Sequence, residues 1–329
     1  MKKRRMENSR ILVTGGAGFI GSNLTEVLLA QNNEVVVLDN FMTGKRENLR
    51  SFESHPNFTL IEGDIRDLAI CRKALDGIDY VLHEAALGSV PRSIQDPMTS
   101  TEVNISGFVN MLFAAQEAKV RRFVYAASSS TYGDSRALPK KEDKIGKPLS
   151  PYAITKYANE LFADNFSRIY GIETIGLRYF NVFGRRQDPY GAYAAVIPKF
   201  VMAMLQHRGP VINGDGTYSR DFTYIDNVIQ ANQLALLADA PEAINTVYNV
   251  AYGERTTLCQ LFDYLKEDLS LFDPAIADLT AQFGPGRPGD IPHSLACIEK
   301  AERLLGYHPE FDVRSGLREA SRWYYENLK

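Results

Sequence analysis

A glycine-rich turn near the start of the chain constrains the fold more than any other feature of the sequence. The apolar strand pattern Ile11–Thr14 runs directly into Gly15-Gly16-Ala17-Gly18-Phe19-Ile20-Gly21, and a helical pattern follows at Ile20–Gln31. Glycines allow a tight turn, and they let backbone N–H groups approach a phosphate at the start of a helix. The glycines recur every third residue, unlike the common G-x-G-x-x-G arrangement. We therefore expect a strand–turn–helix unit that binds the pyrophosphate of a dinucleotide.

Two acidic residues follow the next strand patterns and concern the adenosine end of such a ligand. Asp39 closes the pattern Val35–Asp39, 18 residues after Gly21. A carboxylate there accepts hydrogen bonds from the ribose hydroxyls and would repel a 2′-phosphate, which predicts NAD rather than NADP. Asp64 and Ile65 follow the third strand pattern and can hold the adenine ring. The alternative is that Asp64 or Asp67 caps the next helix.

Strand and helix patterns alternate through the first half of the chain. The expected strands are Ile11–Thr14, Val35–Asp39, Thr59–Glu62, Tyr80–His83, Phe123–Ala127 and Thr174–Arg178. The expected helices are Ile20–Gln31, Leu68–Leu75, Val103–Ala118 and Pro151–Tyr170. Apolar strands that alternate with helices indicate a parallel sheet covered on both faces. The fold class is therefore α/β, a Rossmann-type doubly wound parallel sheet.

The pattern changes after about Phe183, where glycine, proline and aromatic residues become frequent. Mixed segments follow: a helix near Ala195–Gln206, a strand near Phe222–Ile225, a helix near Asn227–Leu237 and a strand near Val247–Val250. We expect residues 1–183, with a returning segment near 222–250, to form the NAD-binding domain. Residues 184–221 and 251–329 would form a smaller mixed α/β C-terminal lobe for the substrate, over the carboxyl edge of the sheet.

Composition excludes several classes of function. The 329 residues carry a net charge of −3, so no basic field predicts nucleic-acid binding. The three cysteines are far apart, which fits reduced thiols in the cytoplasm rather than disulfides. No apolar run approaches the roughly 18 residues of a membrane span, so we expect no membrane association. The five histidines lack metal-ligand spacing, and we expect no metal.

The segment Tyr152-Ala153-Ile154-Thr155-Lys156 follows a proline that suits a helix start. Residues four apart share one face of a helix, so the Lys156 ammonium can lie near Tyr152, stabilise its phenolate and lower its pKa. Upstream, the run Ser128-Ser129-Ser130 ends a strand pattern. Its hydroxyls would point into the ligand crevice and could bind the oxygen that Tyr152 deprotonates. These residues form a candidate catalytic group.

These motifs together resemble the extended short-chain dehydrogenase/reductase family, in its nucleotide-sugar (UDP-hexose) 4-epimerase branch. The resemblance spans nearly the whole chain and rests on Gly15–Gly21, Asp39-Asn40, Asp64-Ile65, His83–Ala86, Ser128–Gly133, Tyr152–Lys156, Leu177–Gly184 and Arg220–Phe222. Within this branch, Ala85–Ser93 and Gly191–Pro198 resemble bacterial UDP-N-acetylglucosamine 4-epimerases.

The resemblance implies a role for each matching residue. Ser128, Tyr152 and Lys156 would be catalytic, with Ser129 and Ser130 open as substitutes for Ser128. The implied cofactor-binding residues are Gly15, Gly18, Phe19, Ile20, Gly21, Asp39, Asn40, Gly44, Asp64, Ile65, Ala85, Ala86, Asn104, Tyr152, Lys156 and Tyr179. The implied substrate-binding residues are Gly88, Ser89, Ser128, Ser129, Ser130, Tyr152, Asn181, Ala195, Val196, Asn213, Arg220, Arg287, Asp290 and Ser294. Arg220 and Arg287 would clamp the diphosphate, since a guanidinium bonds phosphate oxygens bidentately.

The implied reaction is reversible inversion at C4 of a UDP-sugar through a transient 4-keto sugar, with NAD tightly bound. The expected pair is UDP-GlcNAc and UDP-GalNAc, with UDP-Glc and UDP-Gal as a further pair. The alternatives are a 4-epimerase of the uronic acid form, a 4,6-dehydratase and a non-catalytic NAD-sensing protein. A dehydratase needs an acid and a base after Ser128, where this chain has serines.

Two further expectations follow from the resemblance. The loop position that is a large residue, typically tyrosine, in epimerases restricted to the plain hexose is Ser294 here, which leaves room for a C2 acetamido group. Relatives also pair two helices across a two-fold axis. Helices Val103–Ala118 and Pro151–Tyr170 would form such an interface in a homodimer.

Overall fold

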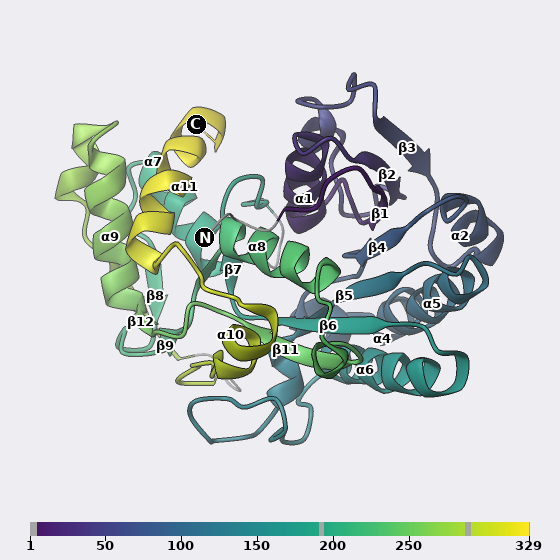
Figure 1. The fold of residues 1–329 in the computed structure, drawn as a ribbon. Coiled ribbons are helices and arrows are strands. Elements are labelled where there is room, and N and C mark those ends of the chain that lie inside the picture. The colour runs from purple at the N-terminus through teal and green to yellow at the C-terminus, as the bar shows by residue number, and fades with distance from the viewer. Residues whose placement is uncertain (1–4, 191–193, 287–290, 329) are drawn as a thin grey trace.

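A parallel sheet of seven strands lies at the centre of the computed structural model, which describes residues 5–190, 194–286 and 291–328 (Figure 1). The strands are β1 (Arg10–Thr14), β2 (Glu34–Asp39), β3 (Phe58–Glu62), β4 (Tyr80–His83), β5 (Arg122–Ser128), β6 (Thr174–Tyr179) and β11 (Thr246–Val250). Their order is β3-β2-β1-β4-β5-β6-β11, and every neighbouring pair is parallel. The order reverses direction between β1 and β4, the place where such sheets bind ligands. The expected Rossmann-type fold is confirmed.

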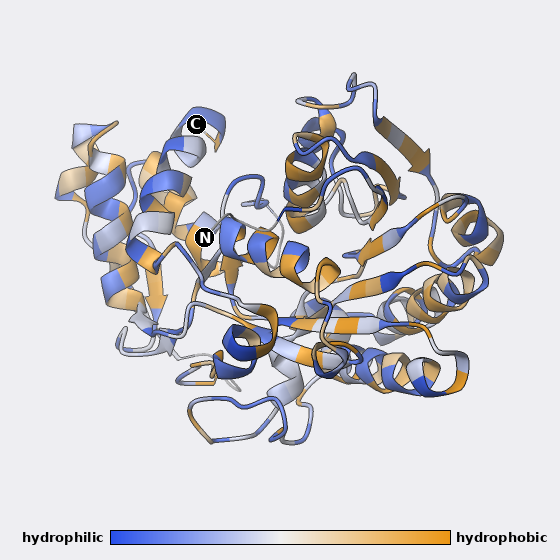
Figure 2. Ribbon diagram, in the orientation of Figure 1, coloured by the Kyte–Doolittle hydropathy of each residue, from blue (hydrophilic) through white to orange (hydrophobic). Residues whose placement is uncertain are grey.

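Helices cover both faces of this sheet. The helices before β11 are α1 (Phe19–Leu29), α2 (Leu68–Ala74), α3 (Val90–Gln95), α4 (Pro97–Thr101), α5 (Phe108–Glu117), α6 (Pro151–Tyr170), α7 (Val196–Leu205) and α8 (Ile225–Leu236). Alternate residues of β1 point to opposite sides: Ile11 and Val13 join the core under α1 and α8, whereas Leu12 joins the core under α2, α5 and α6. Figure 2 shows the apolar stretches along the strands that this alternation produces.

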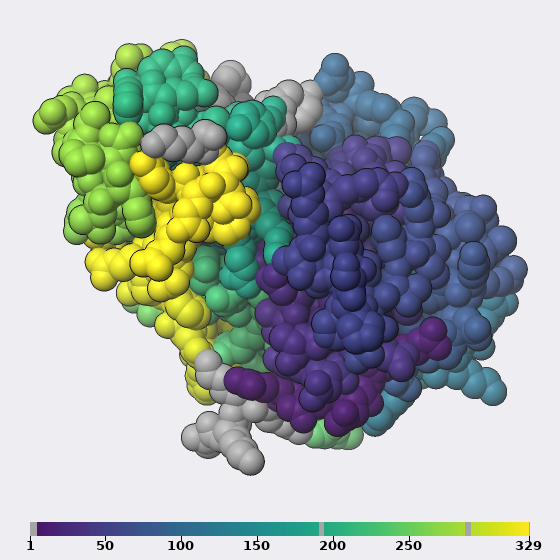
Figure 3. All heavy atoms as spheres, turned by 90° about the horizontal axis from the view of Figure 1, so that it is seen from above, coloured from purple at the N-terminus to yellow at the C-terminus, as the bar shows by residue number. Residues whose placement is uncertain are grey.

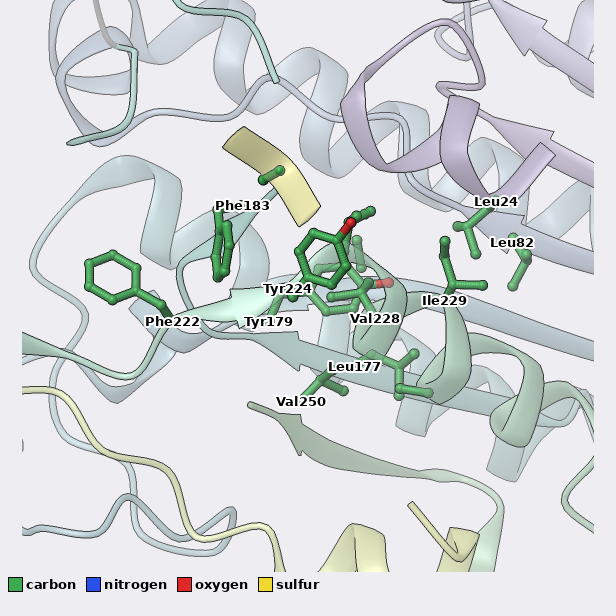
Figure 4. Packing of buried hydrophobic residues seen from close by; sticks show 14 of the residues in the cluster. Leu24, Leu82, Leu177, Tyr179, Phe183, Phe222, Tyr224, Val228, Ile229 and Val250 are labelled. Atoms are coloured by element: carbon green, nitrogen blue, oxygen red, sulfur yellow. The ribbon is translucent and has the colours of Figure 1, made fainter. Parts of the chain in front are cut away.

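The larger core connects the sheet to the C-terminal segments. In Figure 4, Leu24 of α1, Leu82 of β4, Leu177 of β6 and Val228 of α8 lie in one continuous cluster. Phe222 and Tyr224 extend the same cluster toward the C-terminal segments. Burying this much apolar surface is the main stabilising contribution to the arrangement.

The segments after β6 form the other side of the molecule. Their further helices are α9 (Leu258–Ser270), α10 (Glu299–Leu305) and α11 (Val313–Leu328). Short strand pairs join β7 (Val182–Phe183) to β10 (Thr223–Tyr224), β9 (Ser219–Arg220) to β12 (Thr256–Thr257), and β8 (Val211–Asn213) to β13 (Gln282–Gly284). In Figure 3, the purple and blue N-terminal half and the green and yellow C-terminal segments occupy opposite sides of the molecule.

Several local features differ from the sequence expectation. The expected helix Val103–Ala118 begins with a π-helical turn, η2 (Glu102–Gly107), before α5. Single π turns inside helices often lie at functional sites. Helices α3 and α4 were not expected, although Ser89 and Asp96 cap them and a proline occupies the first turn of each. The described residues also contain the 3₁₀ turns η1 (Arg46–Leu49), η3 (Ser129–Tyr132), η4 (Pro241–Ala243) and η5 (Pro274–Asp278).

Candidate active site

A cavity lies at the carboxyl edge of the sheet, along the ends of β1, β2, β4, β5 and β6. It brings together residues from across the chain that the sequence assigned to the cofactor. Those that line it are Gly15, Gly18, Phe19, Ile20, Gly21, Asp39, Asn40, Asp64, Ile65, Ala85, Ala86, Tyr152, Lys156 and Tyr179. Gly88, Ser128 and Asn181, assigned to the substrate, line it as well.

The glycine turn leaves the start of α1 open to this cavity. Gly18 is the N-cap of α1 and has no side chain to cover the free N–H groups of the first turn. Gly15 has φ +69°, and a Cβ atom there would lie 2.8 Å from the Cα of Ala85. A Cβ on Gly21 would lie 2.2 Å from the Gly15 carbonyl oxygen. Side chains are therefore excluded from the turn, which fits a pyrophosphate held by backbone N–H groups.

Asp39 is held rigidly at the adenosine end of the cavity. Its Oδ2 accepts a hydrogen bond from the N–H of Ala17 at 2.9 Å, and its Oδ1 accepts one from the N–H of Phe41 at 2.8 Å. Burial raises the pKa of Asp39, although both hydrogen bonds lower it. Each carboxylate oxygen has a second lone pair, so the group can still accept hydrogen bonds from a ribose.

Asp64 is not the helix cap. Asp67 caps α2, accepting from the N–H groups of Ala69 and Ile70. Asp64 instead accepts from the guanidinium of Arg66 at 2.7 and 3.0 Å and from the amide of Asn40 at 2.8 Å. The hydrogen bonds from Arg66 lower the pKa of Asp64 to about 2. Asp64 is therefore an ionised acceptor at the wall of the cavity.

The candidate catalytic group lies at the other end of the same cavity. Ser128 ends β5, and Tyr152 and Lys156 lie one turn apart on α6. The side chain of Ser128 lies close enough to Tyr152 to lower the pKa of its hydroxyl. The Lys156 ammonium lies 6.0 Å from the centre of the Tyr152 ring. Ser128, Tyr152 and Lys156 therefore line the same cavity, where each can exchange a proton or a hydrogen bond with a ligand.

Burial dominates the ionisation of this pair. It raises the pKa of Tyr152, which the side chain of Ser128 lowers and the charge of Glu84 raises again. The net direction is opposite to the lowered pKa expected from the sequence, because the cost of removing a phenolate from water exceeds the stabilisation that Ser128 provides. Burial also lowers the pKa of Lys156 to about 8, against the opposing charges of Glu84 and Glu160.

A second cavity adjoins the first, and the two share Asn181 and Val182. The expected substrate residues Ala195, Val196, Asn213 and Arg220 line the second cavity. Arg220 also donates to the carbonyl oxygens of Ser219 and Pro292, both at 3.0 Å. The two cavities therefore adjoin at Asn181 and Val182, and the catalytic group lines the first of them.

Other predicted residues lie outside the lining of both cavities. Asn104, in η2, bonds the backbone of Leu87 and the hydroxyl of Thr155, so it supports the cavity wall. Ser89 caps α3, Ser130 donates to the Ser128 hydroxyl at 2.9 Å, and Ser294 donates its N–H to the Ser219 carbonyl at 3.1 Å. Gly44 and Ser129 also lie outside the lining. Arg287 and Asp290 fall outside the described residues.

Three features of the site were missed by sequence reasoning. Glu84 lines the first cavity and is half-buried. Arg178 of β6 forms a buried bidentate ion pair with Glu160 of α6, at 2.7 and 2.8 Å, which holds the catalytic helix against the sheet. Asp221 accepts from the N–H groups of Tyr252, Gly253 and Ala296 and ties the loops beside the second cavity together. Glu84, Arg178 and Asp221 all lie inside motifs that carried the family resemblance, but only their packing reveals these roles.

Two classes of site are absent from the part of the chain that the structure describes. It holds no group of three or more His, Cys, Asp or Glu side chains arranged to bind a metal ion. Within the same residues, no helix combines the length and the apolar character that crossing a membrane requires.

Sheet order and cavity lining together identify the class of the protein, a Rossmann-type enzyme that works with a dinucleotide. Comparison with known proteins is more specific. Residues 11–251 match the model of the NAD dependent epimerase/dehydratase family. The chain is 36% identical to a putative UDP-glucose 4-epimerase of Methanocaldococcus jannaschii, over 96% of this chain and 99% of that protein.

Solved structures of similar proteins point to the same family. A UDP-N-acetylglucosamine 4-epimerase from Methanobrevibacter ruminantium, in complex with UDP-N-acetylmuramic acid, is 39% identical with a TM-score of 0.91, covering 98% of this chain and 99% of that one. A UDP-glucuronic acid 4-epimerase from Bacillus cereus, in complex with UDP-glucuronic acid and NAD, is 33% identical with a TM-score of 0.85, covering 96% and 99%. The chain therefore belongs to the NAD-dependent epimerase/dehydratase family, and its cofactor is NAD.

Proposed function

We propose that this protein is a UDP-sugar 4-epimerase that interconverts UDP-GlcNAc and UDP-GalNAc. The observation that carries the proposal is the meeting of Ser128, Tyr152 and Lys156 in the NAD cavity, beside a second cavity that can hold a nucleotide. The relatives described above include 4-epimerases of three UDP-sugars, which supports the reaction type.

Each residue of the catalytic group has a distinct task in this reaction. Tyr152, as phenolate, removes the proton of the sugar 4-hydroxyl and later returns it. Ser128, which lines the same cavity as Tyr152, orients the same oxygen. The Lys156 ammonium favours the phenolate and can hold a ribose hydroxyl. NAD supplies a hydride acceptor and donor at C4, so the reaction has no net oxidation.

Charge in the first cavity favours a neutral sugar over a uronic acid. Among the described residues that line this cavity, Lys156 is the one cation, and the carboxylates are Asp39, Asp64 and Glu84. A sugar carboxylate is usually bound by arginine, whose planar guanidinium matches it. Glu84 beside the catalytic group would repel such a carboxylate.

Polar side chains in the second cavity suit the nucleotide. We propose that Asn181, Asn213 and Arg220 bind the UDP part, together with the expected contacts of Ala195 and Val196. In the same proposal, residues 1–183 and about 222–250 bind NAD, while residues 184–221 and 251–329 bind the nucleotide sugar.

Product analysis tests the proposed reaction. The purified protein is incubated separately with UDP-GlcNAc, UDP-Glc and the uronic acid UDP-GlcNAcA, and the products are separated by anion-exchange chromatography. We expect the C4 epimer of UDP-GlcNAc to form with the highest kcat/KM. Faster turnover of the uronic acid would replace the proposed substrate by that alternative. A 4-keto-6-deoxy product would identify a dehydratase, and no product with any of them would reject the epimerase.

We also propose a homodimer formed through the outer face of α6. Ile154, Leu161 and Ile169 of this helix are 55%, 54% and 62% exposed and recur every seven or eight residues, so they lie on one side of the helix. Met98 of the neighbouring α4 is 71% exposed. Light scattering should give twice the monomer mass, and Leu161→Glu should reduce it to the monomer value.

A further inference from the structure

Glu84 is a half-buried carboxyl group that lines the catalytic cavity, and the proposed reaction does not use it. It follows β4 directly, and it lines the cavity together with Tyr152 and Lys156. Partial removal from water penalises the charged form of this carboxyl group and raises its pKa. Its position beside the reacting groups therefore calls for an explanation.

A hydrogen-bonded chain holds this carboxyl group in place. The hydroxyl of Tyr179, at the end of β6, donates to Oε1 of Glu84 at 2.8 Å. The amide of Asn232, on α8, donates to the same Tyr179 hydroxyl at 2.9 Å and to the Val228 carbonyl at 2.9 Å. Because Asn232 donates to the tyrosine oxygen, the single Tyr179 proton is directed at Glu84. Glu84 is thus an acceptor, the role that suits a carboxylate.

The charged groups near Glu84 define its surroundings. The charge of Lys156 on α6 favours the ionised form of Glu84, and the charge of Glu84 raises the pKa of Tyr152 on the same helix. From β6, Tyr179 stays protonated, since burial raises the pKa of Tyr179 well above its usual value. His83 on β4 is neutral, because burial lowers its pKa to about 3. Burial raises the pKa of Glu84 itself to about 7, so its charge changes near neutral pH.

We propose that the Glu84 carboxylate is the counter-charge for the oxidised, cationic nicotinamide of bound NAD and thereby sets the redox balance of the cofactor. The reacting end of NAD has to lie beside Tyr152 and Lys156, the space that Glu84 faces. A negative charge there stabilises the cation of NAD⁺ but gains nothing from neutral NADH. The resting enzyme is therefore held in the oxidised state that begins the proposed cycle. The inference needs NAD in the cavity, and it does not depend on which sugar is turned over.

The midpoint potential of the cofactor in the holoenzyme tests this proposal without a sugar substrate. Wild type and Glu84→Gln are equilibrated with a reference redox dye, and the bound NADH is read from its absorbance. Loss of a nearby unit charge should change the ratio of NADH to NAD⁺ affinity about tenfold in favour of NADH. For a two-electron couple this raises the potential by about 30 mV.

The pH dependence distinguishes charge from shape. The difference in potential between Glu84→Gln and wild type should be large at pH 8, where Glu84 is ionised, and small at pH 6, where it is protonated. Tyr179→Phe removes the donor to Glu84, so it should raise the potential at pH 7 by a smaller amount. If Glu84→Gln does not fold, this second variant still tests the proposal.

Glu117→Gln is the matched control, because Glu117 is an exposed carboxylate on α5 that pairs with Arg72. Its potential should equal that of wild type at both pH values. Equal potentials for Glu84→Gln and wild type at pH 8 would overturn the proposal. So would a difference that is the same at pH 6 and pH 8, or a shift of equal size in the control.

Discussion

The ammonium group of Lys156 donates a hydrogen bond to the carbonyl oxygen of Ala126 at 2.8 Å. This bond joins α6 to β5 next to Ser128, so the strand that carries the serine also fixes the lysine. A lysine has three N–H donors, which leaves two of them for the cavity. The catalytic group is therefore organised by the sheet as well as by its own helix.

Replacing Lys156 by methionine should move the activity profile to higher pH. The wild-type ammonium favours the Tyr152 phenolate, and it is lost as pH rises through the Lys156 pKa of about 8. The variant lacks this cation at every pH, so its rate should be low near pH 7 and keep rising with pH as Tyr152 ionises. Measurement of kcat/KM from pH 6 to pH 10 checks this. Superimposable pH profiles for the two proteins would show that Lys156 does not stabilise the Tyr152 phenolate.

Tyr152→Phe should reduce kcat by about 10²–10⁴-fold, the usual contribution of a general base. Nucleotide-sugar binding should persist, since the ring and its packing remain. Initial rates and calorimetric titration with the UDP-sugar measure the two properties separately. Tyr157→Phe, on the same helix and half-buried, is the matched control and should retain activity. A rate near that of wild type for Tyr152→Phe would contradict the assignment.

Gly21→Ala should abolish retention of NAD. The added Cβ would lie 2.2 Å from the Gly15 carbonyl oxygen and 2.8 Å from the Gly16 Cα, so the phosphate-binding turn has to open. Purified wild-type protein should release NAD(H) on denaturation, and the variant should release little. Gly286→Ala, where no atom of the described residues lies within 4 Å of the added carbon, is the control. Equal cofactor contents would argue against the turn as the pyrophosphate site.

Glu160→Gln should lower the free energy of unfolding by about 3–5 kcal/mol, since it leaves the buried charge of Arg178 without its partner. Both side chains of this pair are at most 7% exposed. Asp164→Asn breaks the exposed pair with Arg168 on the same helix, and should cost less than about 1 kcal/mol. Urea denaturation of the three proteins gives the comparison. Similar losses in the free energy of unfolding in both variants would indicate that burial does not make the Arg178–Glu160 pair more important for stability than the exposed pair.

Ser294→Tyr tests the proposed acetamido gate. Ser294 does not line either cavity, but its N–H bonds the Ser219 carbonyl, next to Arg220 in the second cavity. A large ring that points into the site should lower kcat/KM for UDP-GlcNAc by at least about tenfold and spare UDP-Glc. Ser294→Ala should retain both activities. If the tyrosine variant loses both substrates equally, Ser294 is not the gate.

Local sequence patterns were sufficient for the sheet and the helices next to it. All six strands expected in the first half are present within one or two residues, and α6 has the expected bounds Pro151–Tyr170. Strand and helix periodicities are properties of consecutive residues, and residues four apart on a helix share a face wherever the helix lies. The same reasoning failed at η2, because a π turn and a regular helix have nearly the same sequence pattern.

What the sequence determined by itself was the set of local elements and the residue types at the carboxyl edge of the sheet. Only the tertiary structure decided which charges face one another. Glu84 and Tyr179 are 95 residues apart in the chain, and Asp221 accepts N–H groups from residues 31, 32 and 75 positions away. It also decided that Tyr152 is harder to ionise than the Tyr–Lys spacing implied. Burial depends on everything packed around a group, and that information is absent from its neighbours in sequence.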